Sequence, residues 1–147
     1  NNKFVAGFIG SPQMNFFDVT LQAENGKVYA LFGDNKVLVP AEKIKKLVDE
    51  SYVGKEVTMG IPPENISDDP EKVAANPEAT IPVHVEVTEL MGSETYLYFS
   101  TSGKEENVIA RVDPRTHTHT GDDIKVVLDT SRLHFFDKET EANILNR

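Results

Sequence analysis

Phe17-Asp18-Val19-Thr20-Leu21-Gln22-Ala23, followed by the turn Asn25-Gly26, is the stretch of sequence that decides the fold. Apolar and polar residues alternate along it with a period of two, which predicts a strand with one buried face. The pair Asn-Gly favours a tight hairpin turn, because both residues tolerate positive φ. A second strand-like run, 27–32, follows at once. The stretch therefore predicts an antiparallel hairpin.

Short apolar runs of the same kind continue outward from this hairpin to the end of the chain. They predict further strands at 37–39, 57–61, 82–90, 94–101, 108–112, 124–128 and 133–136. In the run 82–90, Val83, Val85 and Val87 are expected on one side of the strand, and a turn at 91–93 is expected to join it to the next strand. Roughly seven to nine short strands indicate a mainly β fold, either one antiparallel barrel or paired barrels.

Two short helices are expected besides the strands. Within 41–50, Ile44, Leu47 and Val48 recur three and four residues apart, which predicts an amphipathic helix. Near the N-terminus, apolar residues with helical spacing stop at Gly10-Ser11-Pro12, where a helix would end. We therefore interpret residues 1–12 as the end of a linker helix that enters from a preceding domain, and 13–147 as the domain itself. The polar, proline-containing segment at about 67–80 is expected to be an exposed excursion.

Composition and charge narrow the classes of function. The chain has 147 residues, 39% of them hydrophobic, which suits one globular domain. Its formal net charge of −9 disfavours nucleic acid and anionic lipid as partners, because both are normally held by clustered Lys and Arg. No run approaches the ~18 apolar residues of a membrane span, so direct membrane insertion is not expected. Cysteine is absent, which excludes disulfides and thiolate metal sites.

The sequence offers few groups with a recognisable catalytic spacing. It has no phosphate-binding loop and no nucleophile elbow, so neither ATP hydrolysis nor nucleophilic catalysis is expected of this chain alone. His117 and His119 could present two imidazoles to a metal from an extended segment, but a third ligand cannot be named, and a solvated turn is the better interpretation. The paired carboxylates in loops are expected to be solvated. We therefore assign no catalytic, cofactor-binding or metal-binding residue.

Several aromatic residues could serve either an interface or the core. They are Tyr96, Tyr98, Phe135 and Phe136, and all four fall in predicted strands. Aromatic residues are enriched in protein interfaces, but packing in the core is the default for aromatics that alternate along a strand. We expect the core to take at least half of them.

A long motif covers the predicted end of the linker helix. It reads Phe4-Val5-Ala6-Gly7-Phe8-Ile9-Gly10-Ser11-Pro12-Gln13-Met14-Asn15-Phe16, and it closely resembles the junction after the nucleotide-binding domain in maltose and multiple-sugar importer ATPases. Three weaker matches follow in the order of that family, and they lie at 60–66, 89–96 and 133–140. Together the four motifs span nearly the whole chain.

The resemblance implies an OB-fold-like barrel of the transport-associated type, acting as the regulatory and dimerisation domain of the ATP-binding subunit of a sugar importer. It implies a cytoplasmic position, peripheral to the inner face of the cell membrane. The implied partners are a second copy of the subunit, the transporter membrane subunits and a regulatory protein. No cofactor is implied for this chain, since ATP and Mg²⁺ would bind in the missing N-terminal domain.

The resemblance also suggests which residues carry the function. Gly10, Ser11, Pro12, Met14 and Asn15 would form a hinge that relays movement of the nucleotide-binding domain. A second group, from the last predicted strand, would form an interface or the core, and it comprises His134, Phe135 and Phe136.

One position departs from the pattern of that family. The family usually has Arg after Gly-Ile in the second motif, whereas this chain has Pro62, which offers neither charge nor a backbone donor. An alternative to the importer hypothesis is a free-standing barrel that binds a small ligand, an oxyanion or a sugar. The acidic balance of the chain and the lack of an evident Arg/Lys nest weaken that alternative. The sequence leaves the transported carbohydrate open.

Overall fold

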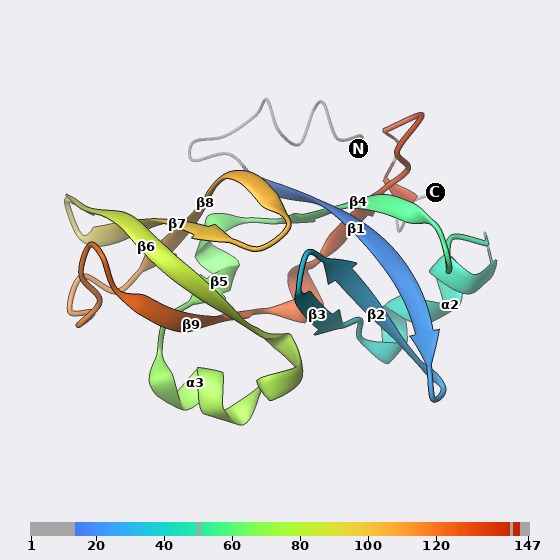
Figure 1. The fold of residues 1–147 in the computed structure, drawn as a ribbon, viewed down its shortest axis with the longest axis horizontal. Coiled ribbons are helices and arrows are strands. Elements are labelled where there is room, and N and C mark those ends of the chain that lie inside the picture. Colours follow the sequence, from blue (N-terminus) through green and yellow to red (C-terminus); the bar gives the residue numbers. More distant parts are fainter. Residues whose placement is uncertain (1–13, 50, 142, 145–147) are drawn as a thin grey trace.

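The structure is a computed structural model that describes residues 14–49, 51–141 and 143–144. Ten strands dominate it (Figure 1), and they are β1 (Asn15–Glu24), β2 (Lys27–Phe32), β3 (Asn35–Leu38), β4 (Glu56–Ile61), β5 (Ile66–Ser67), β6 (Thr80–Met91), β7 (Glu94–Thr101), β8 (Lys104–Val112), β9 (Asp123–Leu128) and β10 (His134–Phe136). Two α-helices, α2 (Ala41–Asp49) and α3 (Pro70–Ala75), and three short 3-10 turns complete the described elements. The mainly β prediction is confirmed.

The strands form two five-stranded antiparallel sheets that lie side by side along the long axis (Figure 1). The strand order is β10-β4-β1-β2-β3 in the first sheet and β5-β9-β6-β7-β8 in the second. The predicted hairpin joins β1 to β2, with Glu24 opposite Lys27. Its turn residues Asn25 and Gly26 have φ of 52° and 79°, as the Asn-Gly pair allows. The architecture is that of two curled OB-type sheets.

Strand β10 joins the first sheet although it comes from the far end of the chain. It pairs antiparallel with β4, and Phe135 lies opposite Met59. The chain therefore leaves the first sheet after β4, builds the whole second sheet, and then returns to complete the first sheet. Periodicity along the sequence predicts the strand but carries no information on this partner.

One hydrophobic core connects the two sheets. Phe17 and Leu21 of β1 and Phe99 of β7 are at most 1% exposed, and they belong to one continuous cluster of buried side chains. Helix α2 adds Leu47, which is fully buried, with Ile44 packed against the same cluster. The alternation of buried and exposed residues in β1 and β7 is the pattern of strands with one face in a core. The predicted helix 41–50 is confirmed.

The expectation for Val87 is wrong. Val83 and Val85 are buried as predicted, but Val87 is 48% exposed. A β-bulge between Val85 and Val87 shifts the register, so that Val85 lies opposite Phe99 and Val87 lies opposite Tyr98. One extra residue in a strand moves the following side chains to the other face of the sheet. Val87 therefore leaves the core.

The segment 67–80 contains structure that the sequence analysis did not predict. Helix α3 begins after Asp69, whose side chain accepts a hydrogen bond from the amide of Glu71, and a 3-10 turn at Pro77–Ala79 follows. No residue of α3 is buried. Strand β5 was also missed, because only its two residues pair with β9. The predicted linker helix at 1–12 lies outside the described residues.

Candidate functional site

Asn15 is a buried polar residue that joins the two sheets. Its side-chain Nδ2 donates to the carbonyl oxygen of Ile109 on β8 at 2.9 Å, and its Oδ1 accepts from the amide of Ile109 at 2.9 Å. Nδ2 also donates to the carbonyl oxygen of Ile61 on β4 at 3.2 Å. Asn15 is 7% exposed, so these bonds lie largely out of water, where an unpaired backbone group is costly. The Asn15 side chain therefore links β1 and β4 of the first sheet to β8 of the second sheet.

Two turns make a second contact between the sheets. Gly33 follows β2 and Gly103 follows β7, and a Cβ atom built on either glycine would collide with the backbone of the other. Both have positive φ, 58° and 81°, which glycine adopts without strain. Asn35 Nδ2 donates to Thr101 Oγ1 and to the Ser102 carbonyl oxygen, each at 3.0 Å. The absence of side chains at the two glycines permits this approach.

Only two of the five predicted hinge residues belong to the described part of the chain. Asn15 holds the position given above, and Met14 is half-buried beside Gly60, where an added Cβ would lie 2.6 Å from Met14 Sδ. Gly10, Ser11 and Pro12 lie outside the described residues. The two residues that can be placed therefore sit where β1 meets both sheets.

The predicted interface residues divide between core and surface. Phe135 and Phe136 are 0% and 1% exposed, whereas His134 is half-buried. The His134 ring stacks on that of Phe136 with centroids 6.5 Å apart, and burial, followed by the charges of Lys43 and Arg132, lowers the pKa of His134. Only His134 of the three offers appreciable side-chain surface. Tyr96 and Tyr98 are half-buried. Two of the four aromatic residues, Phe135 and Phe136, therefore belong to the core.

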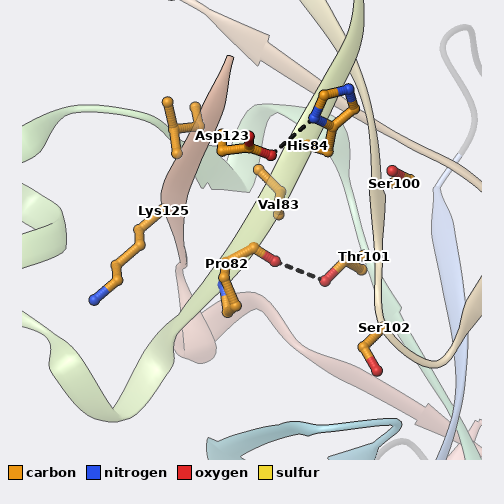
Figure 2. Close-up of a pocket in the computed structure, with 9 residues that line it drawn as sticks. Pro82, Val83, His84, Ser100, Thr101, Ser102, Asp123 and Lys125 are labelled. Carbon is orange, nitrogen blue, oxygen red and sulfur yellow. Dashed lines mark hydrogen bonds and ion pairs between the residues drawn. The ribbon is translucent and has the colours of Figure 1, made fainter. Parts of the chain in front are cut away.

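A shallow hollow with polar and apolar lining residues lies on the second sheet, across β9, β6 and β7 (Figure 2). Its volume is about 660 Å³. His84 Nδ1 lies 2.8 Å from Asp123 Oδ1, and this hydrogen bond is the main cause that raises the pKa of His84. Thr101 Oγ1 donates to the Pro82 carbonyl oxygen at 2.9 Å, and Ser100 Oγ donates to Glu86. The polar groups of the hollow thus largely satisfy one another.

The hollow lacks the geometry of acyl-transfer chemistry. A serine nucleophile needs a hydrogen bond to its general base. Among the described residues, His84 Nδ1 bonds to Asp123 and Ser100 Oγ donates to Glu86, and no hydrogen bond joins Ser100 to His84 although the two lie on opposite positions of paired strands. The arrangement is a structural His–Asp pair on a sheet surface.

His117 and His119 lie in the loop between β8 and β9, and both are exposed. No group of three metal-ligating side chains occurs among the residues that the structure describes. The loop is held instead by Asp68, whose Oδ2 accepts hydrogen bonds from the hydroxyls of Thr116 and Thr118. The sequence analysis missed this role of Asp68, because no local pattern links residues about fifty positions apart.

Pro62, the departure noted in the sequence analysis, shapes the backbone between β4 and β5. It precedes the 3-10 turn Pro63–Asn65 with φ of −67°, and its carbonyl oxygen accepts from the amide of Asn65 at 3.0 Å. Proline fixes φ near this value, so Pro62 favours the turn that leads from β4 to β5. Within the described ranges, no helix is long and apolar enough to cross a membrane.

The two joined sheets have the OB-type architecture expected from the sequence. Residues 10–66 match the family model described as the MalK OB fold domain, and residues 69–136 match the TOBE domain. The chain therefore belongs to the family of OB-fold and TOBE domains found at the C-terminal end of sugar ABC importer ATP-binding subunits. The matched part of those relatives excludes their ATPase domain.

Curated relatives are similar over nearly the whole chain. The oligosaccharides import ATP-binding protein MsmX of Bacillus subtilis is 41% identical over 143 residues, which cover 97% of this chain and 38% of MsmX. The multiple sugar-binding transport ATP-binding protein MsmK of Streptococcus mutans is also 41% identical, with 97% of this chain and 37% of MsmK covered. The chain thus spans somewhat under two fifths of the length of these relatives.

A solved structure has a similar fold at low sequence identity. It is the cytoplasmic molybdate-binding protein ModG with molybdate bound, with a TM-score of 0.60 and 16% identity. The match covers 87% of this chain and 97% of ModG. At this identity the likeness bears on the fold alone.

Proposed function

We propose that this chain is the regulatory and dimerisation domain of the ATP-binding subunit of an ATP-driven sugar importer. One observation carries the proposal: the chain matches the OB-fold and TOBE region of sugar importer ATP-binding proteins at 41% identity over 97% of its length. In this proposal the chain hydrolyses no ATP, and ATP and Mg²⁺ bind in a separate nucleotide-binding domain. Its position is the cytoplasmic face of the membrane, beneath the membrane subunits.

The junction between the sheets supports a mechanical role. Asn15 is bonded to β4 and β8 together, and the turns at Gly33 and Gly103 touch at a second point. Two separate contacts resist rotation of one sheet against the other, so the module would move as one body. In this proposal the segment 10–15 relays movement of the nucleotide-binding domain, because any displacement of Asn15 acts on both sheets.

The partners of the chain follow from the same proposal. A second copy of the subunit would pair with it and hold the ATPase dimer together, and the membrane subunits would contact it through the parent protein. A regulatory protein is a further partner.

A chimera of the Bacillus subtilis relative tests the importer function. The matched C-terminal region of MsmX is replaced by this chain, and oligosaccharide uptake is measured in cells that lack MsmX. We expect the chimera to restore uptake, and MsmX truncated before the matched region to fail. A chimera that assembles and hydrolyses ATP but supports no uptake would contradict the proposal.

Sedimentation equilibrium tests the dimerisation part by itself. We expect a reversible dimer of the isolated chain at concentrations up to about 100 μM, the weak range typical of small interfaces. A strictly monomeric chain over that range would remove dimerisation from the proposed function. The chimera result would stand separately.

A second candidate function is a barrel that binds a small oxyanion or a sugar. The hollow in Figure 2 favours it, whereas the Asp123 carboxylate in the hollow opposes an anion. Thermal unfolding in the presence of molybdate, sulfate, phosphate or maltose tests the ligand-binding function against the importer function. A ligand present at about 100 times its Kd would stabilise the fold by ~2.7 kcal/mol, and we expect no such shift.

A further inference from the structure

The outward face of the β6–β7–β8 ribbon carries a row of apolar side chains. Val87 lies opposite Tyr98, which lies opposite Ile109, and directly opposed residues share one face of a sheet. Met91 and Tyr96 belong to the same face by the period of two. We name this surface the outward patch, and it consists of Val87, Met91, Tyr96, Tyr98 and Ile109. In Figure 1 the β6–β7 hairpin reaches the left end of the molecule.

The outward patch is partly exposed, with Tyr96, Tyr98 and Ile109 half-buried, although its strands have a core on the other side. Leu97, Phe99 and Ala110 alternate with the patch residues and are fully buried. Val87 and Met91 are 48% and 47% exposed, and the bulge before Val87 turns both away from the core. Apolar side chains gathered on an exposed surface mark interaction sites more often than single exposed residues do.

Acidic side chains lie within and beside the outward patch, since Glu89 lies opposite Tyr96 on the same face. Glu89 Oε1 accepts from the Tyr98 hydroxyl at 3.0 Å, and Glu86 accepts from Ser100 at the same distance. Glu94 Oε2 lies 2.9 Å from Arg111 Nε, and Arg111 lies 3.8 Å from Glu64 as well. Arg111 is therefore shared between two carboxylates. The four carboxylates named here outnumber this one guanidinium, so the net charge of these five groups is negative.

We propose that the outward patch is a docking surface for an amphipathic helix of another protein whose polar face is basic. A sheet face with apolar residues is normally covered by another element, and Tyr and Met are enriched in interface centres. Lys or Arg beside the apolar residues of the helix would meet the carboxylates of Glu86 and Glu89. The same face of a second copy would bring like charges together, and anionic lipid would be repelled for the same reason.

Binding of a designed peptide tests this inference. The probe is a helical peptide of about 18 residues with Leu on one face and Lys on the other. We expect it to shift amide resonances in 87–111 of the ¹⁵N-labelled chain, and to bind more weakly as salt rises. A peptide with Glu in place of every Lys is expected to cause no shift. Equal binding of the two peptides, or shifts that map to other strands, would overturn the proposal.

A matched pair of variants locates the site. Met91→Lys and Leu90→Lys each add one positive charge to the same hairpin, but Leu90 points to the opposite face and is 70% exposed. We expect Met91→Lys to weaken binding of the basic peptide by about 10-fold or more, because it replaces an apolar contact by a charge of the same sign as the peptide, and Leu90→Lys to have much less effect. Equal effects of the two variants would refute the assignment to the patch. Thermal unfolding of both variants checks that they are folded.

Two further measurements exclude other occupants. If the chain self-associates in sedimentation and Met91→Lys abolishes that association, the patch serves a second copy and the inference fails, while dimerisation survives. If the chain binds phosphatidylglycerol vesicles and Met91→Lys abolishes that binding, the patch serves a membrane and the inference also fails. We expect neither association to depend on Met91.

Discussion

The side-chain amide of Asn15 pairs with the backbone of Ile109 as a neighbouring strand would. One bond is donated from Nδ2 and one is accepted at Oδ1, and both are 2.9 Å long. A single side chain thus closes the gap between two sheets where no backbone ladder does so. The residue has the correct pattern of donor and acceptor, which neither Asp nor Leu provides.

Asn15→Leu is expected to destabilise the fold. The substitution leaves the amide and carbonyl groups of Ile109 without their partner in a largely buried place, which costs about 2 to 4 kcal/mol of unfolding free energy. Urea denaturation measures the loss. The control is Asn107→Leu on β8, the strand that carries Ile109. Asn107 is exposed, so this substitution is expected to cost less than about 0.5 kcal/mol. Equal costs for the two variants would contradict the role of Asn15.

Gly103→Ala is expected to cost more than Gly26→Ala. The two glycines have similar φ, 81° and 79°, so the strain of placing alanine at positive φ is matched. Gly26 has open space around it, whereas a Cβ at Gly103 would meet the backbone of Gly33. We expect about 1 kcal/mol for Gly26→Ala and about 3 kcal/mol for Gly103→Ala, measured by thermal unfolding. Similar values would show that the two turns do not touch in solution.

Asp137 is expected to make stability fall at acid pH. The hydrogen bond from the Tyr52 hydroxyl, followed by backbone bonds from Thr140 and Glu139, lowers the pKa of Asp137 from 3.8 to about 2. Because the pKa of Asp137 is lower in the folded protein than in the unfolded chain, the ionised carboxylate contributes its full share of the unfolding free energy above the unfolded pKa. That contribution is lost as the pH falls from about 4 to about 2. Tyr52→Phe should raise the pKa of Asp137 and flatten that part of the stability curve.

An NMR titration of the Asp137 carboxyl carbon checks this expectation. Tyr29→Phe is the control, since the Tyr29 hydroxyl does not bond to Asp137, and it should leave the titration unchanged. An unaltered midpoint in Tyr52→Phe would show that Tyr52 does not govern this carboxylate.

Thr58→Val is expected to be neutral or stabilising by up to about 1 kcal/mol. Thr58 Oγ1 is the buried side-chain polar atom without a hydrogen-bond partner among the described residues, and Thr58 is 1% exposed. Replacing an unsatisfied hydroxyl by a methyl group removes a desolvation cost and keeps the branched shape that a strand favours. Chemical denaturation measures the change. A loss of more than about 1 kcal/mol would mean that the hydroxyl has a partner in solution.

The sequence predicts most of the strands and helix α2. It does not predict the bulge in β6 or helix α3. The strand pattern of 17–23 and the helical spacing of Ile44 and Leu47 are confirmed as β1 and α2. The exposure of Val87 was missed, because a bulge of one residue leaves no mark on the alternation of valines. Helix α3 was missed although Asp69-Pro70 is a helix-start signal, since the polar composition outweighed it.

The candidate site was only partly foreseen. Met14 and Asn15 were singled out by resemblance, but the bonds from Asn15 to Ile109 join residues 94 positions apart, a separation that no spacing rule covers. The contact between Gly33 and Gly103 is hidden for the same reason: each glycine alone predicts a turn, and neither predicts its neighbour.

The return of β10 to the first sheet governs when this protein can fold during its synthesis. Strands β1 to β4 are synthesised before the second sheet, yet β4 has one edge without its partner until residues 134–136 are made. Pairing over such a separation is slow, because the loop must be closed before the contact stabilises it. The sheet that contains β1 is thus begun before the second sheet but completed after it. The free edge of β4 has to be protected from pairing with other chains until β10 is made.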